Sequence, residues 1–330
     1  LAPAMIASLF INWDLWAIAT MMLAIYWFDR KQYLNSSLAM AISISTKFLP
    51  VFLLIPIAFI LWREAKAKEL IKYLAVVAAT WLAINLPFAL TTPTGWWRFY
   101  KLNLERGADW GSIWLALQQL GVNFTNLNYL SILLLLISMT SIAIVLFELK
   151  YTPTLASVAF LVLASVMVAS KVYSPQYVLW LTPLAAIALT NKKDLHAFWI
   201  WQAVETIYHV AIWQHIALVT DAKFGLASTP FAVLTLVRIA GTRTSSPHRY
   251  LATVATSAEE MSASVKEIAK NANDAAKVAT EAVVVTEALA AAPLPPAQLH
   301  LEIRVGGAVS RGSSSGRGRR RTGGGRRCGD

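Results

Sequence analysis

Residues 34–62 read LNSSLAMAISISTKFLPVFLLIPIAFILW, an apolar stretch with a single charge, Lys47, near its middle. Basic residues flank the stretch on both sides, at 30–31 and within 63–72. The positive-inside rule places both basic clusters in the cytoplasm, so the stretch must cross a membrane twice or re-enter it. A helix breaks at Pro50 in any case. We therefore predict two short helical arms that meet at 47–50. A single tilted span, with one basic cluster outside, is the alternative.

The composition of the chain indicates that lipid is the solvent for much of its surface. Of 330 residues, 57% are hydrophobic and only 14% are charged, with a mean hydropathy of +0.53. A soluble domain of this length has no room to bury so much apolar surface. The 13 Trp and 10 Tyr suit the interfacial belts of a membrane protein. The single Cys328 excludes an internal disulfide.

Apolar stretches follow one another along residues 1–241, and several approach the roughly 20 residues that a spanning helix needs. Only helices satisfy the backbone of such runs in lipid. We predict an all-α fold, a polytopic transmembrane helix bundle with about 8–10 membrane segments. The stretches are 1–11, 15–28, 34–62, 73–91, 129–149, 154–170, 177–190, 196–219 and 226–240.

Under this topology one set of polar residues gathers at the outer face of the membrane. Its members are Asn12, Trp13, Asp14, Lys47, the segments 92–128 and 171–176, and Asp221. The 92–128 segment interleaves aromatic and charged residues, which predicts an interfacial amphipathic helix, with an ordered surface loop as the alternative. Two further basic clusters, at 192–193 and 238–249, belong to the cytoplasmic side.

Three ionisable residues at the rims of apolar helices are candidates for chemistry. Asp14 suits the N-cap of the helix that follows it, and a substrate contact is the added hypothesis. Lys47 either snorkels toward water or faces an anionic lipid head group. Lys171 follows an apolar run, where a cation is already favourable for the helix dipole.

A polar stripe also runs along 196–219. Gln202, Glu205 and His209 share one helical face. Hydrogen bonding between helices is the favoured interpretation, with pairing of Glu205 and His209 at the i,i+4 spacing. These residues are too few for a zinc site, and no metal site is predicted.

Three blocks of sequence resemble a known family. They are Asn12-Trp13-Asp14-Leu15, then Ser45-Thr46-Lys47-Phe48-Leu49-Pro50, and then Lys171-Val172-Tyr173-Ser174-Pro175-Gln176-Tyr177 with Trp180-Leu181-Thr182-Pro183-Leu184. In this order they look like the membrane-embedded GT-C glycosyltransferases that use polyprenyl phosphate donors, and among them the mannosyltransferase-like family formerly treated as a domain of unknown function. The likeness covers residues 1–241.

The resemblance implies transfer of a sugar such as mannose from a polyprenyl-phosphate donor, with no other cofactor, at the outer face of the bacterial cytoplasmic membrane. It makes Lys47 and Lys171 the cations for the donor phosphate and Asp14 the candidate base. Asn12, Trp13, Ser174, Gln176 and Tyr177 would line the substrate pocket. The family's catalytic carboxylate would lie upstream of Leu1, so we expect these residues to be N-terminally incomplete and inactive by themselves.

After a linker at 242–250, residues 251–292 have a different pattern. Small and apolar residues alternate at spacings of three and four, which predicts a cytoplasmic coiled coil that dimerises through 251–290. Residues 255–264 resemble the methylation site of methyl-accepting chemotaxis proteins, which makes Glu259 and Glu260 candidate methylation sites. The Pro/Gly/Arg-rich tail at 293–330 is expected to be disordered, with no specific nucleic-acid partner.

Two other functions remain open from the sequence. In the glycosyltransferase interpretation, the membrane region is joined to the chemoreceptor fragment near residue 250 either naturally or through an error of gene assembly. In a multi-span chemoreceptor-like sensor, the membrane region would instead signal to the methyl-accepting helix. A transporter would use the broken helices and the polar stripe. All three interpretations place the chain in a membrane with a cytoplasmic C-terminus.

Overall fold

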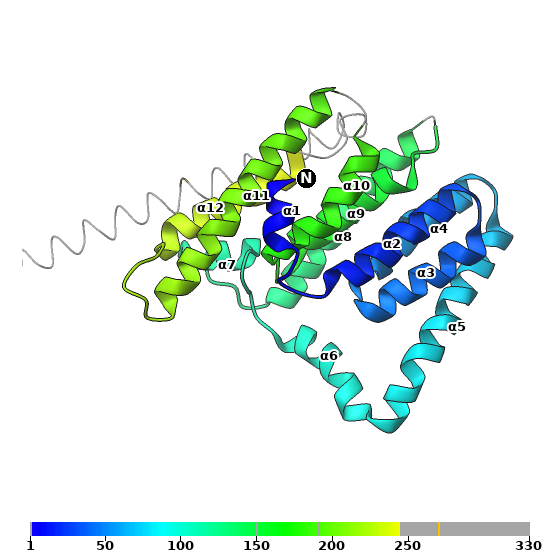
Figure 1. The fold of residues 1–330 in the computed structure, drawn as a ribbon, viewed down its shortest axis with the longest axis horizontal. Coiled ribbons are helices and arrows are strands. Elements are labelled where there is room, and N and C mark those ends of the chain that lie inside the picture. Colours follow the sequence, from blue (N-terminus) through cyan, green and yellow to red (C-terminus); the bar gives the residue numbers. More distant parts are fainter. Residues whose placement is uncertain (1, 150, 190–191, 245–269, 271–330) are drawn as a thin grey trace, which may run out of the picture. The chain divides into compact units, whose positions relative to one another are not determined.

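A computed structural model describes residues 2–149, 151–189, 192–244 and 270. The fold of the described residues is all-α, as predicted, and comprises twelve α-helices and two short 3-10 helices (Figure 1). The helices are α1 (Pro3–Ser8), α2 (Asp14–Asp29), α3 (Tyr33–Thr46), η1 (Leu49–Leu53), α4 (Leu54–Arg63), α5 (Ala67–Thr91), α6 (Pro93–Glu105), α7 (Ile113–Gln119), α8 (Leu127–Glu148), α9 (Leu155–Ala169), η2 (Pro175–Tyr177), α10 (Val178–Ala188), α11 (Lys192–Val219) and α12 (Ser228–Thr244).

Among the described helices, α5 and α8 are long and apolar enough to cross a membrane. Little of either helix is buried in the protein, and large apolar side chains such as Phe88 and Leu136 are exposed along them. Two further apolar stretches, Leu49–Arg63 and Leu155–Ala169, are shorter than a full span. The wider expectation of about 8–10 membrane segments stays a prediction.

The break predicted within 34–62 is confirmed. The α3 helix ends at Thr46, and Lys47 has an extended backbone with φ −152° and ψ 132°. Pro50 then lies in the first turn of η1, where its missing N–H costs no hydrogen bond. One unbroken helix over 34–62 is therefore wrong, because two separate helical arms meet at Lys47; the number of times this stretch crosses a membrane stays a prediction.

Small residues hold α2 close to α3. Ala17, Ala24, Ala39 and Ala41 are buried, which lets the two backbones approach closely. Ser43 Oγ donates a hydrogen bond to the Ala17 carbonyl at 2.6 Å. Ser36 Oγ donates another to the Ala24 carbonyl at 2.7 Å. Hydroxyl-to-carbonyl bonds between apolar helices fix the α2–α3 hairpin, and with it the residues at its open end.

The segment at 92–128 forms two helices instead of the one predicted. Pro93 begins α6 directly after α5, and the two helices meet at a sharp bend (Figure 1). None of the residues of α6 is buried. Trp96 of α6 contacts Trp81 of α5, with ring centroids 6.3 Å apart. An amphipathic helix is thus present, as predicted, and its position at a membrane surface stays a prediction.

The predicted coiled coil, its methylation sites Glu259 and Glu260, and the tail at 293–330 lie outside the described residues, apart from Lys270. The cytoplasmic position of the C-terminus and the dimer through 251–290 likewise stay predictions.

Candidate functional site

The Asp14 carboxylate joins the three blocks of sequence singled out above. Lys47 forms an ion pair with Oδ1, and Trp180 Nε1 donates a hydrogen bond to Oδ2 at 3.0 Å. The Asp14 side chain is fully buried, whereas that of Lys47 remains 23% exposed. We call Asp14, Lys47 and Trp180 the Asp14 cluster. It carries one buried negative charge that a partly exposed ammonium balances.

The predicted N-cap role of Asp14 is wrong. Trp13 is the residue that precedes the helix, and no side chain caps α2. Asp14 is already the first residue of α2, and its two oxygens are directed to Lys47 and Trp180. A carboxylate in the first turn still interacts favourably with the helix dipole.

The residues predicted to line the substrate pocket differ from one another in burial and in their contacts. Trp13 is exposed, and its backbone N–H donates to Asn12 Oδ1 at 2.7 Å. Gln176 is buried in η2. The Tyr177 ring packs 6.1 Å from that of Tyr173.

Lys171 is not part of the Asp14 cluster. Its ammonium donates to the carbonyls of Asn103, Leu104 and Arg106 at 2.9, 3.3 and 2.7 Å, and to Asn128 Oδ1 at 2.6 Å. Three of these acceptors lie at the C-terminal end of α6, where carbonyls have no partner within the helix. Burial, and then the positive charge of Arg106, lowers the pKa of Lys171.

A second ion pair lies next to Lys171, and the sequence analysis did not single it out. Arg106 pairs with Asp109, and the two side chains are 34% and 31% exposed. We call Arg106 and Asp109 the rim pair. The only sequence signal was the i,i+3 spacing of opposite charges across Gly107, a pattern common on surface loops.

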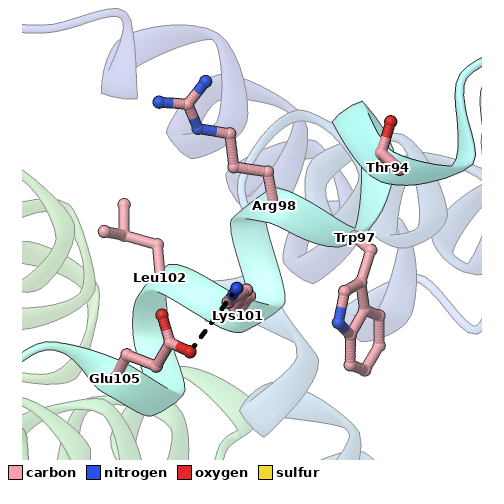
Figure 2. Close-up of a pocket in the computed structure, with 6 residues that line it drawn as sticks. All are labelled: Thr94, Trp97, Arg98, Lys101, Leu102 and Glu105. Atoms are coloured by element: carbon pink, nitrogen blue, oxygen red, sulfur yellow. Dashed lines mark ion pairs between the residues drawn. The ribbon is translucent and has the colours of Figure 1, made fainter. Parts of the chain in front are cut away.

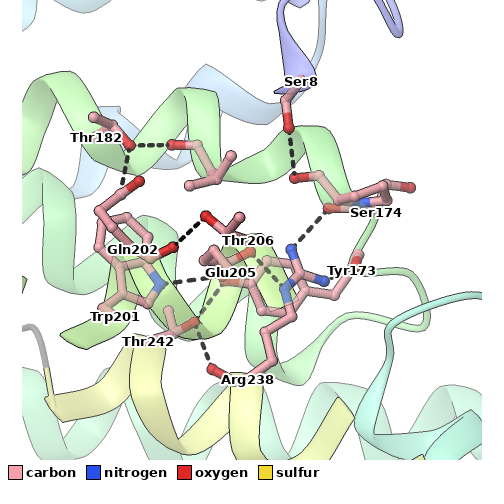
Figure 3. A network of polar contacts seen from close by, with 12 residues as sticks. Ser8, Tyr173, Ser174, Thr182, Trp201, Gln202, Glu205, Thr206, Arg238 and Thr242 are labelled. Carbon is pink, nitrogen blue, oxygen red and sulfur yellow. Dashed lines mark hydrogen bonds and ion pairs between the residues drawn. The ribbon is translucent and has the colours of Figure 1, made fainter. Parts of the chain in front are cut away.

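A third ion pair is fully buried and joins α11 to α12 (Figure 3). Arg238 Nε donates to Glu205 Oε2 at 2.8 Å, and Nη2 donates to the Ser174 carbonyl at 3.0 Å. The guanidinium also lies between two aromatic rings, 3.8 Å from the Tyr173 centroid and 4.3 Å from that of Tyr208. We call Arg238 and Glu205 the buried pair. It anchors the loop that carries Tyr173 and Ser174.

The basic cluster at 238–249 is predicted on the cytoplasmic side, which stays a prediction; its first member, Arg238, is completely buried in the structure. The predicted pairing of Glu205 with His209 is wrong, because Trp213 Nε1 donates to His209 Nε2 at 3.2 Å and Glu205 faces Arg238. Hydrogen bonding between helices is confirmed for Gln202, whose Nε2 donates to Thr182 Oγ1 at 3.3 Å.

The outer face of α6 is hollowed between side chains of a single helix (Figure 2). Lys101 and Glu105 form an ion pair there at 3.8 Å. Both side chains are largely exposed, so this hollow is a surface feature rather than an enclosed site. In the described part of the chain, no three residues of His, Cys, Asp or Glu lie close enough together to hold a metal ion.

Comparison of the chain with protein-family models, with characterised proteins and with solved structures gives no significant match.

Proposed function

We propose that this chain is a membrane-embedded glycosyltransferase. It moves a sugar from a polyprenyl-phosphate donor to an acceptor hydroxyl at the outer face of the cytoplasmic membrane. The proposal rests on the Asp14 cluster, in which residues from α2, the α3–η1 break and α10 meet at one carboxylate. The three sequence blocks that resemble GT-C enzymes supply one residue each to this cluster.

The chemistry requires a cation where the leaving group develops charge. The acceptor oxygen forms a bond to the anomeric carbon while the bond from that carbon to the phosphate oxygen breaks. Polyprenyl phosphate then leaves with the electron pair. The partly exposed ammonium of Lys47 suits this charge, because a cation in a site shielded from water stabilises it strongly.

Asp14 serves two states of the same site. Without donor, it balances Lys47 and keeps the ammonium at the open end of the α2–α3 hairpin. When the donor phosphate binds the Lys47 ammonium, the Asp14 carboxylate loses its ion-pair partner. It can then accept the proton of the acceptor hydroxyl. Trp180 holds the second oxygen in place throughout.

Exposed apolar surface supports a membrane location for this reaction. Helices α5 and α8 expose large apolar side chains along their length, and such surface is rare on a soluble monomer. The α6 helix follows α5 and exposes Trp97 and Phe99 beside Arg98 and Lys101. A helix of this composition suits the boundary between head groups and hydrocarbon, where the lipid donor would be met.

The test is sugar transfer by the complete product of the gene, reconstituted in liposomes with radiolabelled sugars on short-chain polyprenyl phosphates. We expect labelled product from at least one donor, and about a 100-fold loss of kcat/KM for Lys47→Gln. The matched control is Lys72→Gln, since this lysine is 70% exposed on α5 and belongs to a surface ion pair. Its transfer rate should equal that of the wild type.

If the folded protein transferred sugar from none of the polyprenyl-phosphate donors, the proposed glycosyltransferase function would be wrong. Transfer that Lys47→Gln leaves unchanged would instead remove the Asp14 cluster from the reaction.

A further inference from the structure

We infer that Arg106, held by Asp109, is the second cation that binds the donor phosphate, in the place that the sequence assigns to Lys171. This inference rests on the proposed function and deepens it. It concerns the residues that recognise the phosphate group of the lipid.

Lys171 has no capacity left for a phosphate. An ammonium has three N–H donors, and four acceptors already surround this one at 2.6 to 3.3 Å. Three of them are backbone carbonyls: those of Asn103 and Leu104 belong to the last turn of α6, and that of Arg106 follows directly after the helix. A phosphate would therefore have to displace bonds that complete a helix end.

What Lys171 does instead is fix the segment that carries the rim pair. Its ammonium holds the Arg106 carbonyl, while its own carbonyl accepts the Asp109 N–H at 2.8 Å. Two residues further on, the Tyr173 N–H donates to the Trp110 carbonyl at 3.2 Å. These bonds join residues 106–110 to residues 171–173. The backbone of Arg106 is therefore fixed in position, while its side chain remains available.

The Arg106 side chain has the opposite character. Among the described residues, its guanidinium has a single ion-pair partner, Asp109, and a third of the side chain is exposed. A guanidinium offers five N–H donors in a planar fork that matches phosphate oxygens. Asp109 can orient this fork with one edge and leave donors free for a ligand.

The position of Arg106 is compatible with a phosphate shared with Lys47. The segment 171–180 contacts both the neighbourhood of the rim pair and Asp14: the Tyr173 N–H donates to the carbonyl of Trp110, next to Asp109, and Trp180 Nε1 donates to Asp14. Phe48, next to Lys47, packs on Phe99 and Tyr100 of α6 at 6.3 and 6.0 Å. The α6 helix thus runs from the neighbourhood of Lys47 to Arg106 at its C-terminal end.

The experiment measures binding of a short-chain polyprenyl phosphate, without sugar, to the purified full chain in nanodiscs. Arg106→Gln should weaken binding at least about tenfold, as loss of a charge-assisted contact predicts. Arg106→Lys should recover part of the loss, since it keeps the charge without the fork. Arg30→Gln, an exposed arginine at the C-terminal end of α2, is the matched control and should bind like the wild type. The neutral polyprenol should bind all variants equally.

Lys171→Gln separates the two cations. Its amide can still donate to carbonyls, so at a temperature where the variant is folded we expect binding within about threefold of the wild type. Wild-type affinity in Arg106→Gln, or an equal loss in folded Lys171→Gln, would overturn the inference. Inorganic phosphate that competes fully at equal concentration would do so as well, because the site would then be one for free phosphate.

The two proposals fail separately. Binding that depends on Arg106 without any sugar transfer by the complete protein rejects the proposed function and retains this inference. Transfer that proceeds normally in Arg106→Gln rejects the inference and retains the function.

Discussion

The buried pair and the rim pair contain the same two chemical groups in opposite surroundings. Arg238 and Glu205 have side chains that are 0% and 1% exposed, whereas those of Arg106 and Asp109 are 34% and 31% exposed. The Arg238 guanidinium bonds to a carboxylate and to two backbone carbonyls, and it lies between two aromatic rings. The Arg106 guanidinium bonds to one carboxylate.

The difference separates a structural charge from one available to a ligand. A buried charge must be fully bonded, because each unmet donor there costs free energy. Each of the three guanidinium nitrogens of Arg238 donates a hydrogen bond, so this charge joins α11, α12 and the 173–174 loop. A charge at a rim needs less compensation from the protein, since water supplies the rest until a ligand replaces it.

The largest expected effect is on the buried pair. Arg238→Met leaves the Glu205 carboxylate buried without its partner and removes the donors to Tyr173 and Ser174. We expect the free energy of unfolding to fall by about 3–5 kcal/mol, as for other broken buried ion pairs. Denaturant titration of the protein in mixed micelles measures this value.

A double variant provides the control for this comparison. Arg238→Met with Glu205→Leu removes both charges and should recover part of the stability that the single variant loses. A single variant as stable as the wild type would mean that the buried pair holds nothing together.

The Asp14 cluster lies between the two extremes, so its expected effect is smaller. Asp14→Asn keeps an oxygen for Trp180 but leaves the ammonium of Lys47, which is 23% exposed, without its counter-charge. We expect a loss of about 1–3 kcal/mol in the free energy of unfolding, measured by the same titration. Glu69→Gln, in the exposed pair with Lys72, is the control and should change little. If both variants lost the same free energy of unfolding, burial of the Asp14 carboxylate would make no difference to stability.

Much of the fold follows from local sequence. Hydrophobic runs predicted most of the helices, and Lys47 with Pro50 predicted the break between α3 and η1. These signals are local, because a helix depends on residues within one or two turns. The grouping of Asp14 with Lys47 came from charge clusters that orient the helices, and the ion pair bears it out.

The remaining contacts could not be read from the sequence, because their partners are distant. Lys171 bonds to carbonyls more than 60 residues away, and nothing near it in the sequence indicates that α6 ends there. Arg238 is the first of several basic residues, a pattern typical of a cytoplasmic basic cluster. The sequence does not indicate its contacts with Glu205 and Tyr173. Backbone acceptors carry no sequence signature at all.

The smallest expected effect on stability belongs to the rim pair. Arg106→Gln and Asp109→Asn, singly and combined in a double-mutant cycle, should give a coupling free energy of about 0–1 kcal/mol, because exposed ion pairs contribute little. Denaturant titration in the same micelles measures all four proteins. A coupling of about 3 kcal/mol or more, the loss typical of a broken buried ion pair, would make Arg106 a structural residue. A coupling near zero, together with the weakened phosphate binding expected of Arg106→Gln, would mean that its charge acts on the ligand rather than on the fold.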